Sequence, residues 1–224
     1  MAPREFDDLF DMAAARKGGA EAFEATLPKM KSAKALAGVP DDRWLAQFSK
    51  GIFSTGLNWK VVDNKWTGIE EALWGFDIGR CKMMSDDDLD ALLKDKRVIR
   101  HAKKLLSVRD NAVFFSDLAL EHGSAAKFFA DWPADDFAGL LLLMKKRGSR
   151  IGGNTGAYAL RFLGKDGYVL GGDVVKALIR EGVVDKAPTS QRDMAAVQAA
   201  FNHWHEQSGR PYAHISRTLA CTVE

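Results

Sequence analysis

The spacing of apolar residues along the chain limits its fold more strongly than any other feature. Apolar residues recur at helical intervals in nearly every segment, and no run shows the alternation that is typical of a half-buried strand. Residues 20–37 have the pattern of one amphipathic helix, and residues 99–120 have that of a longer one. We therefore expect an all-α fold of about ten helices with no significant sheet.

Local signals place the ends of several of these helices. Ser85 followed by Asp86, Asp87 and Asp88 has the form of a capping box, in which two side chains satisfy backbone N–H groups at a helix start. No internal repeat or long linker interrupts the chain. We expect residues 1–38 to be a helical extension packed on the core, and residues 39–224 to form one compact domain.

Composition excludes several classes of protein. The chain has 224 residues, of which 46% are hydrophobic and 28% are charged, as in a soluble globular protein. No window approaches the roughly 18 consecutive apolar residues of a membrane span. Residues 1–11 are acidic where a secretion signal would be basic and then apolar, so we expect a cytoplasmic protein. Two cysteines are too few for a disulfide framework or a four-thiolate zinc site.

The formal net charge of +2 conceals two strongly basic segments. Residues 145–165 hold six basic and no acidic residues, a local charge of +6. Residues 94–113 hold seven basic and two acidic residues, a local charge of +5. Each segment has two interpretations, which are a solvated helix face and a contact surface for the phosphates of a nucleic acid.

The first basic segment contains a glycine-rich turn between two expected helices. Glycine stands at positions 148, 152 and 153, so backbone amides can approach an external anion with no Cβ in the way. This pattern is typical of a phosphate-binding hairpin. It is also compatible with an ordinary helix-helix turn that needs glycine for its left-handed cap.

Asp173 follows two glycines at another expected helix start. The simplest explanation of a carboxylate in that position is an N-cap. Asp173 lies eighteen residues after Thr155. The glycine turn, the helix that opens with Thr155 and this carboxylate therefore follow one another along the chain, and their order and spacing suggest a functional role for Asp173.

In this order, the features resemble the helix-hairpin-helix DNA glycosylases, which are defined by a hairpin, a Gly/Pro-rich loop and an Asp. The resemblance covers roughly residues 40–180 and is nearest to the bacterial DNA-3-methyladenine glycosylase I family. The segments that carry it are Gly56-Leu57-Asn58-Trp59, Ile99-Arg100-His101 and Lys145-Lys146-Arg147-Gly148.

The resemblance implies an enzyme that extrudes a damaged base from double-stranded DNA and hydrolyses its bond to the sugar. Leu57 matches the position of the wedge that fills the gap. Trp59 would stack on the base, with Phe53 and Trp44 as further pocket residues. Each of these side chains could instead be a core residue, and for Phe53 and Trp44 we favour the core interpretation. Asp173 would stabilise positive charge on the sugar and orient the attacking water.

The resemblance also assigns the residues that bind the DNA backbone. These are Lys145, Gly148, Ser149, Arg150, Ile151, Gly152, Gly153, Asn154 and Thr155 of the hairpin, together with Arg100 and Lys103. Relatives that also cut the strand carry a Lys in the hairpin for Schiff-base attack on the sugar. Asn154 stands at that position, so we expect a monofunctional glycosylase.

The chain departs from glycosylase I in two respects. Gly51 stands eight residues before Trp59, where those enzymes carry a pocket Glu. Their zinc ligands are also missing, and Val174 follows Asp173 where a His would be. We expect no metal and no cofactor, and we interpret His203, His205, His214 and Cys221 as helix-packing residues.

The sequence therefore predicts a monomeric protein that does not associate with a membrane. It would release an alkylated purine from double-stranded DNA, with 3-methyladenine as the favoured substrate. Two alternatives remain open, since the pocket lacks its Glu. The same fold could act on another damaged base, or the chain could be a noncatalytic DNA- or lesion-binding protein.

Overall fold

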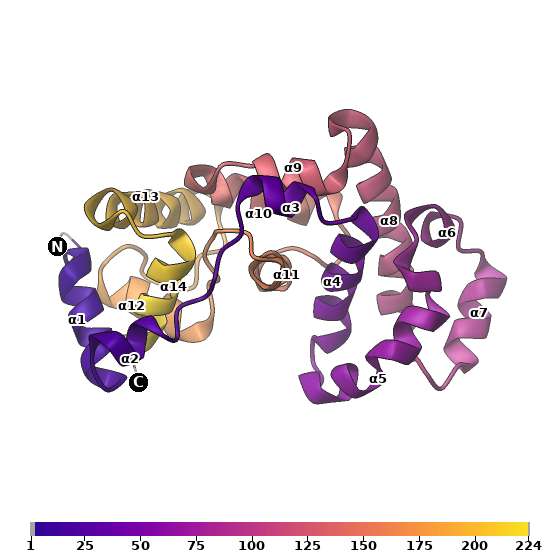
Figure 1. The fold of residues 1–224 in the computed structure, drawn as a ribbon, viewed down its shortest axis with the longest axis horizontal. Helices are drawn as coiled ribbons and strands as arrows, with labels where there is room; N and C mark the ends of the chain where they lie inside the picture. Colours follow the sequence, from indigo (N-terminus) through magenta and orange to yellow (C-terminus); the bar gives the residue numbers. More distant parts are fainter. Residues whose placement is uncertain (1–2, 224) are drawn as a thin grey trace. The chain divides into compact units, whose positions relative to one another are not determined.

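The computed structural model describes residues 3–223, and the regular structure in that range is entirely helical (Figure 1). It comprises fourteen α-helices and two short 3-10 helices. The all-α prediction is therefore confirmed. The additional helices are short, and three of them have five residues: α2 (Ala20–Glu24), α3 (Ala33–Ala37) and α6 (Ile78–Lys82).

The expected single helix over residues 20–37 is wrong, since α2 ends at Glu24 and α3 begins at Ala33. Pro28 lies between them. Proline has no N–H for a helical hydrogen bond and it disfavours helical geometry at the residue before it, so the apolar periodicity continues where the helix cannot.

Contacts divide the described chain into two compact units. Unit 1 contains the residues up to Met30, Pro133–Leu140 and the residues from Asp166 onward. Unit 2 contains Lys31–Trp132 and Leu141–Lys165. Residues 31–38 therefore belong to unit 2. Neither unit begins or ends between residues 38 and 39, where the sequence predicts a boundary.

Unit 2 is built around a cluster of buried aromatic rings. Phe129 of α9 (Ala125–Asp131) stacks on Trp44 of α4 (Asp41–Ser54), with ring centroids 5.3 Å apart. The ring centroids of Phe48 in α4 and Phe115 in α8 (Ala102–His122) lie 5.4 and 5.5 Å from that of Phe129. The remaining helices of this unit include α5 (Trp59–Ala72), η1 (Trp74–Phe76), α7 (Asp86–Lys94) and α11 (Asn154–Leu163).

Unit 1 has a core of its own around Tyr168. The Tyr168 ring lies 5.1 Å from that of Phe137 and 4.4 Å from that of Phe201, and its hydroxyl donates to Gln198 Oε1 at 3.1 Å. Burial is the main cause that raises the pKa of Tyr168 above its ordinary value. The helices of this unit are α1 (Phe6–Arg16), α2, η2 (Ala134–Asp136), α12 (Gly172–Arg180), α13 (Gln191–Ser208), α14 (Tyr212–Cys221) and the first turn of α10 (Phe137–Arg147).

Polar side chains fix the starts of helices in unit 2. The capping box at Ser85 is confirmed, because Ser85 Oγ accepts from Asp88 N at 3.1 Å and Asp88 Oδ2 accepts from Ser85 N at 3.0 Å. Asp41 is the first residue of α4, and its side chain caps a different helix, α9. Its two carboxylate oxygens accept from the backbone N–H groups of Ala125 and Ala126, at 3.0 and 2.7 Å, at the start of α9.

Replacement of Asp41 by Ala should lower the free energy of unfolding by about 1–2 kcal/mol, because two N–H groups of α9 lose their acceptor. Urea unfolding followed by circular dichroism measures this loss. Asp42→Ala is the matched control, since it removes the neighbouring first-turn carboxylate, which pairs with Arg43 at the surface. Equal losses in the two variants would contradict the capping role.

Candidate nucleic-acid interface

The predicted hairpin is a tight turn that connects α10 to α11, and a side chain of α8 anchors it. Ser149 N donates to Asn111 Oδ1 at 2.8 Å, and Asn111 Nδ2 donates to Ser149 O at 2.9 Å. Asn111 is completely buried. Because both hydrogen bonds join the same two residues, they fix the position and the orientation of the turn.

The glycines of the hairpin have two different roles. A Cβ on Gly156 would lie 2.2 Å from the carbonyl oxygen of Ile151, and one on Gly148 would lie 2.3 Å from the buried Ile151 side chain, so both positions must lack a side chain. Gly153 precedes α11 with a φ of +61°, and a Cβ there would have no neighbour within 4 Å. The first N–H groups of α11 therefore lie beside a residue without a side chain, as an anion-binding helix start requires.

Only part of the predicted +6 charge of residues 145–165 faces solvent. Lys145, Lys146 and Arg150 are exposed around the hairpin. Arg147 pairs with Glu121 of α8 at 2.7 Å. Lys165 is buried, and its ammonium donates to Ala130 O at 3.2 Å and also to Trp132 O. Arg161 is half-buried, so the exposed cations of this segment, apart from the paired Arg147, are Lys145, Lys146 and Arg150.

Arg150 has a φ of +62°, which is uncommon for a residue with a side chain and is often found at functional sites.

The predicted wedge lies in the short loop between α4 and α5, residues 55–58, which we call the wedge loop. Leu57 is 44% exposed, and Trp59, the first residue of α5, is 62% exposed. Asn58 caps α5 by accepting from Lys60 N at 3.0 Å. Gly56 has a φ of +74°, so the loop turns where a side chain is disfavoured. Leu57 and Trp59 are thus accessible to a ligand.

Lys104 of α8 anchors the start of the wedge loop. Its side chain is buried, and its ammonium donates to Phe53 O at 2.9 Å and to Thr55 O at 2.6 Å, where α4 ends and the wedge loop begins. Burial, and then the charge of Arg150, lower the pKa of Lys104 below its ordinary value. Lys104 therefore points inward, although it belongs to a segment that the sequence predicts as a solvated or phosphate-binding face.

One face of α8 thus anchors both loops. Lys104 and Asn111 are seven residues apart, so they project from the same side of the helix. Asn111 is not among the residues predicted from the sequence. In the sequence, Asn111 is a single amide among the apolar residues of a long helix. That pattern predicts a buried polar contact, but it does not identify the partner.

Gly51 lies where α4 packs against α11. A Cβ on Gly51 would be 3.5 Å from both Thr155 Cγ2 and Thr155 O, an ordinary van der Waals distance. An alanine would therefore fit there, in contact with Thr155. Gly51, which the sequence resemblance aligns with a pocket Glu, therefore faces the first turn of α11.

The second basic segment is partly neutralised. Arg97 pairs with Asp95 at 2.7 Å, and Arg109 pairs with Asp86 at 3.6 Å. Arg100 and Lys103 are exposed, as contacts with a DNA backbone require.

Asp173 belongs to unit 1, whereas the hairpin and the wedge loop belong to unit 2. The explanation of Asp173 as an N-cap is wrong, because Gly171 is the N-cap of α12 and Asp173 lies inside the first turn. Its exposed carboxylate pairs with Lys176 Nζ at 3.2 Å.

Trp44 and Phe53 are fully buried. Their burial, and the stacking of Trp44 on Phe129, fit the core role that the sequence also allowed.

The C-terminal histidines and Cys221 have separate surroundings. His205 Nδ1 lies 2.7 Å from Arg210 O, and His214 Nε2 lies 2.9 Å from Pro28 O. Cys221 packs with Ala13, Ala14 and Phe23. Within residues 3–223, no group of three or more His, Cys, Asp and Glu side chains is arranged to hold a metal ion. No helix in the same range is long and apolar enough to cross a membrane.

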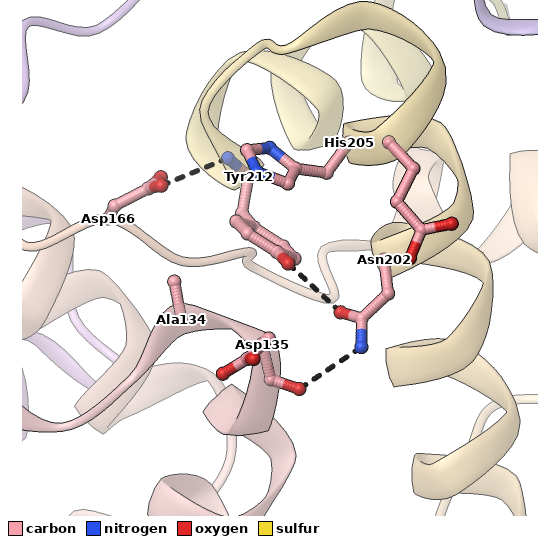
Figure 2. Close-up of a pocket in the computed structure, with 7 residues that line it drawn as sticks. Ala134, Asp135, Asp166, Asn202, His205 and Tyr212 are labelled. Atoms are coloured by element: carbon pink, nitrogen blue, oxygen red, sulfur yellow. Dashed lines mark hydrogen bonds between the residues drawn. The ribbon is translucent and has the colours of Figure 1, made fainter.

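Unit 1 contains an acidic pocket of about 360 Å³ (Figure 2). Burial, followed by the charges of Asp135, Asp166 and Glu206, raises the pKa of Tyr212 to about 12. Asp166 is occupied in capping α14, since it accepts from the N–H groups of Tyr212 and Ala213. A negative lining disfavours phosphate, so this pocket is unsuited to a DNA backbone. It is lined by Ala134, Asp135, Asp166, Asn202, His205, Glu206 and Tyr212.

Comparisons with known proteins agree with the resemblance drawn from the sequence. Residues 40–137 match the family model of the methyladenine glycosylases. Among solved structures, 3-methyladenine DNA glycosylase I from Staphylococcus aureus is similar at 19% identity, with a TM-score of 0.52 over 70% of this chain and 91% of that one. A Glu-to-Gln mutant from the same organism is similar at 20% identity and a TM-score of 0.52, over 65% and 85% of the two chains.

A Tyr-to-Phe mutant of 3-methyladenine DNA glycosylase I in complex with 3-methyladenine matches with the same identity and coverage as the Glu-to-Gln mutant, at a TM-score of 0.50. No curated protein matches the sequence. The resemblance is confirmed, and the chain has the fold of these glycosylases.

Replacement of Lys104 by Met should loosen the wedge loop, because the carbonyl oxygens of Phe53 and Thr55 lose their donor. The amide of Leu57, which donates to Ser54 O at 3.0 Å, should then exchange with solvent about tenfold faster. Hydrogen-deuterium exchange measures this change. The matched control is Lys103→Met, which removes an exposed ammonium in the same helical turn. Similar exchange in both variants would contradict the anchoring role.

Proposed function

We propose that this chain, which has the fold of 3-methyladenine DNA glycosylase I, extrudes an alkylated purine from double-stranded DNA and hydrolyses its N-glycosidic bond. The observation that carries the proposal is the arrangement in unit 2. There, a single helix anchors an open, positively charged hairpin and a loop that presents Leu57 and Trp59 to solvent. The favoured substrate is 3-methyladenine, and the enzyme acts as a monomer without cofactor or metal.

In this proposal, the hairpin and the second basic segment hold the phosphate backbone. The open start of α11 beside Gly153 accepts a phosphate, and Lys145 and Arg150 supply positive charge around it. Arg100 and Lys103 contact the backbone from the start of α8. These contacts position the duplex without reading its sequence.

The wedge loop then holds the duplex open. Leu57 fills the gap that the extruded nucleotide leaves, and the Trp59 ring stacks on the base. An alkylated purine is cationic, so an aromatic face attracts it electrostatically as well as by contact area. Trp44 and Phe53 are enclosed by the core, so the proposal relies on Leu57 and Trp59.

Asp173 serves the bond cleavage. As the base leaves with the bonding electron pair, positive charge builds on the sugar, and a carboxylate on that side stabilises it. Asp173 orients the water that adds to the sugar carbon and accepts the proton that this water loses. The alkylated base departs as a neutral molecule, which requires little acid assistance. Asn154 has no nucleophilic amine, so the strand is not cut.

A second candidate function is a noncatalytic protein that binds damaged DNA, and the observation that favours it is Gly51. No carboxylate is available at that position to hydrogen-bond a base, and Thr155 occupies the adjacent space. The same observation leaves another damaged base as an alternative substrate.

Asp173→Asn should reduce base release at least about a hundredfold, because the amide can neither balance the charge of the sugar nor take the proton. The assay is incubation with methylated DNA under single-turnover conditions, with chromatography of the released bases. Asp185→Asn, which changes an exposed carboxylate of the same unit, should act like the wild type.

Two results would contradict this assignment. Undiminished release by Asp173→Asn would remove Asp173 from the reaction, and a covalent DNA adduct trapped with borohydride would exclude a monofunctional mechanism. Salt-dependent DNA binding with no release from any of several lesion substrates would favour the noncatalytic alternative.

Gly153→Asp should weaken binding to damaged and undamaged duplexes alike, by about tenfold, because it sets a negative charge where the phosphate is expected. Fluorescence anisotropy at two salt concentrations measures the affinity. Gly153→Asn is the matched control, as it brings similar backbone strain at the positive φ without the charge. If Asp and Asn reduce the affinity equally, the hairpin is not in contact with phosphate.

A further inference from the structure

Helix α11 carries an exposed aromatic pair that the proposed function does not use. Tyr158 is 46% exposed and Phe162 is 72% exposed, and Trp59 is the other aromatic side chain among the large apolar residues that are exposed within residues 3–223. The two rings are nearly parallel, at 24°, with centroids 6.2 Å apart. Single exposed apolar residues are common on protein surfaces, but two neighbouring rings in nearly parallel planes form an exposed aromatic patch.

The pair belongs to one stripe of α11 that starts at the hairpin. Asn154, Tyr158 and Phe162 follow at intervals of four residues, and all three are exposed. The residues that pack α11 into unit 2, such as Ala157 and Leu160, lie on the other side of the helix. The stripe is therefore a continuous exposed face from the open helix start to the last turn.

The charge around this stripe indicates the kind of partner that it suits. Lys145, Lys146 and Arg150 are exposed at its start, and residues 145–165 contain no carboxylate. An apolar protein surface would not need this positive charge, and a free anion would not need aromatic rings. A nucleic acid strand combines both requirements, because it has anionic phosphates and flat bases.

The dimensions of the helix agree with such a strand. At 1.5 Å per residue, Tyr158 and Phe162 lie about 6 and 12 Å along the axis from Asn154. Successive phosphates of one strand are about 3.4 Å apart along a duplex axis. If a phosphate is bound at the hairpin, the next few nucleotides of that strand therefore lie at distances similar to those of Tyr158 and Phe162 from Asn154.

We propose that Tyr158 and Phe162 form a stacking surface for an unpaired base of the DNA strand that the hairpin holds. This inference rests on the proposed function in that DNA is the ligand, but it does not require catalysis. A base within a duplex has both faces covered by its neighbours, so the surface selects DNA in which a base has left the stack.

The test compares two DNA probes that differ in one unpaired base. One is a fully paired duplex, and the other is the same duplex with a single bulged 2-aminopurine, whose fluorescence reports stacking. The double variant Tyr158→Leu, Phe162→Leu keeps apolar side chains and removes both rings. It should lose at least about tenfold in affinity for the bulged probe and less than twofold for the paired duplex, since stacking on a ring contributes about 1–3 kcal/mol per base.

Two control variants separate stacking from other effects. Tyr158→Phe with Phe162→Tyr keeps both rings and should bind both probes as the wild type does. Leu120→Ser changes a highly exposed apolar residue of α8 in the same unit, and it should also leave both affinities unchanged. The midpoint of thermal unfolding should be the same in every variant, because the altered side chains are exposed.

The result also distinguishes this inference from the proposed function. Loss of affinity for the bulged probe supports the stacking surface even if the wild type releases no base from methylated DNA. Equal affinity of the double Leu variant and the wild type for the bulged probe overturns the stacking surface, and base release by the wild type would leave the glycosylase proposal intact.

Discussion

The candidate interface depends on a few polar contacts made by one face of α8. Lys104 donates to Phe53 O near the end of α4 and to Thr55 O in the wedge loop, and Asn111 holds the backbone of Ser149 in the hairpin. Both side chains are buried, so each contact is made where an unpaired polar group would be costly. Loops on a protein surface are mobile by default. Because the two loops share a rigid support, their spacing is fixed by the seven residues that separate Lys104 from Asn111.

The sequence predicts the helical class and some of the helix starts well, for physical reasons that are local. Apolar periodicity shows where a helix is amphipathic, and the capping box at Ser85 is formed by residues that are adjacent in the chain. Residues 20–37 show the limit of that reasoning, because one proline outweighs a continuous apolar pattern. Leu57 and Trp59 were found through the order of motifs, and the structure leaves both of them exposed.

The remaining features could not be read from the sequence because they depend on distant partners. Lys104 is one of seven basic residues in its segment, and only the position of the end of α4 explains why this one is buried while Lys103 is exposed. Arg147 contributes to a basic run, yet Glu121 of another helix neutralises it. A sum of charges over a window therefore overstates the charge that a ligand meets, which here comes to a few exposed cations at the hairpin.

The contact between Gly51 and Thr155 has a consequence for how base specificity can change in this fold. Because a Cβ at position 51 would already lie in van der Waals contact with Thr155, any side chain at position 51 would stand against the first turn of α11. The side chain that would read the base and the segment that would grip the phosphate are thus coupled sterically. A substitution at position 51 would therefore also be felt at the start of the hairpin helix, so lesion preference and phosphate contact would not change independently of each other.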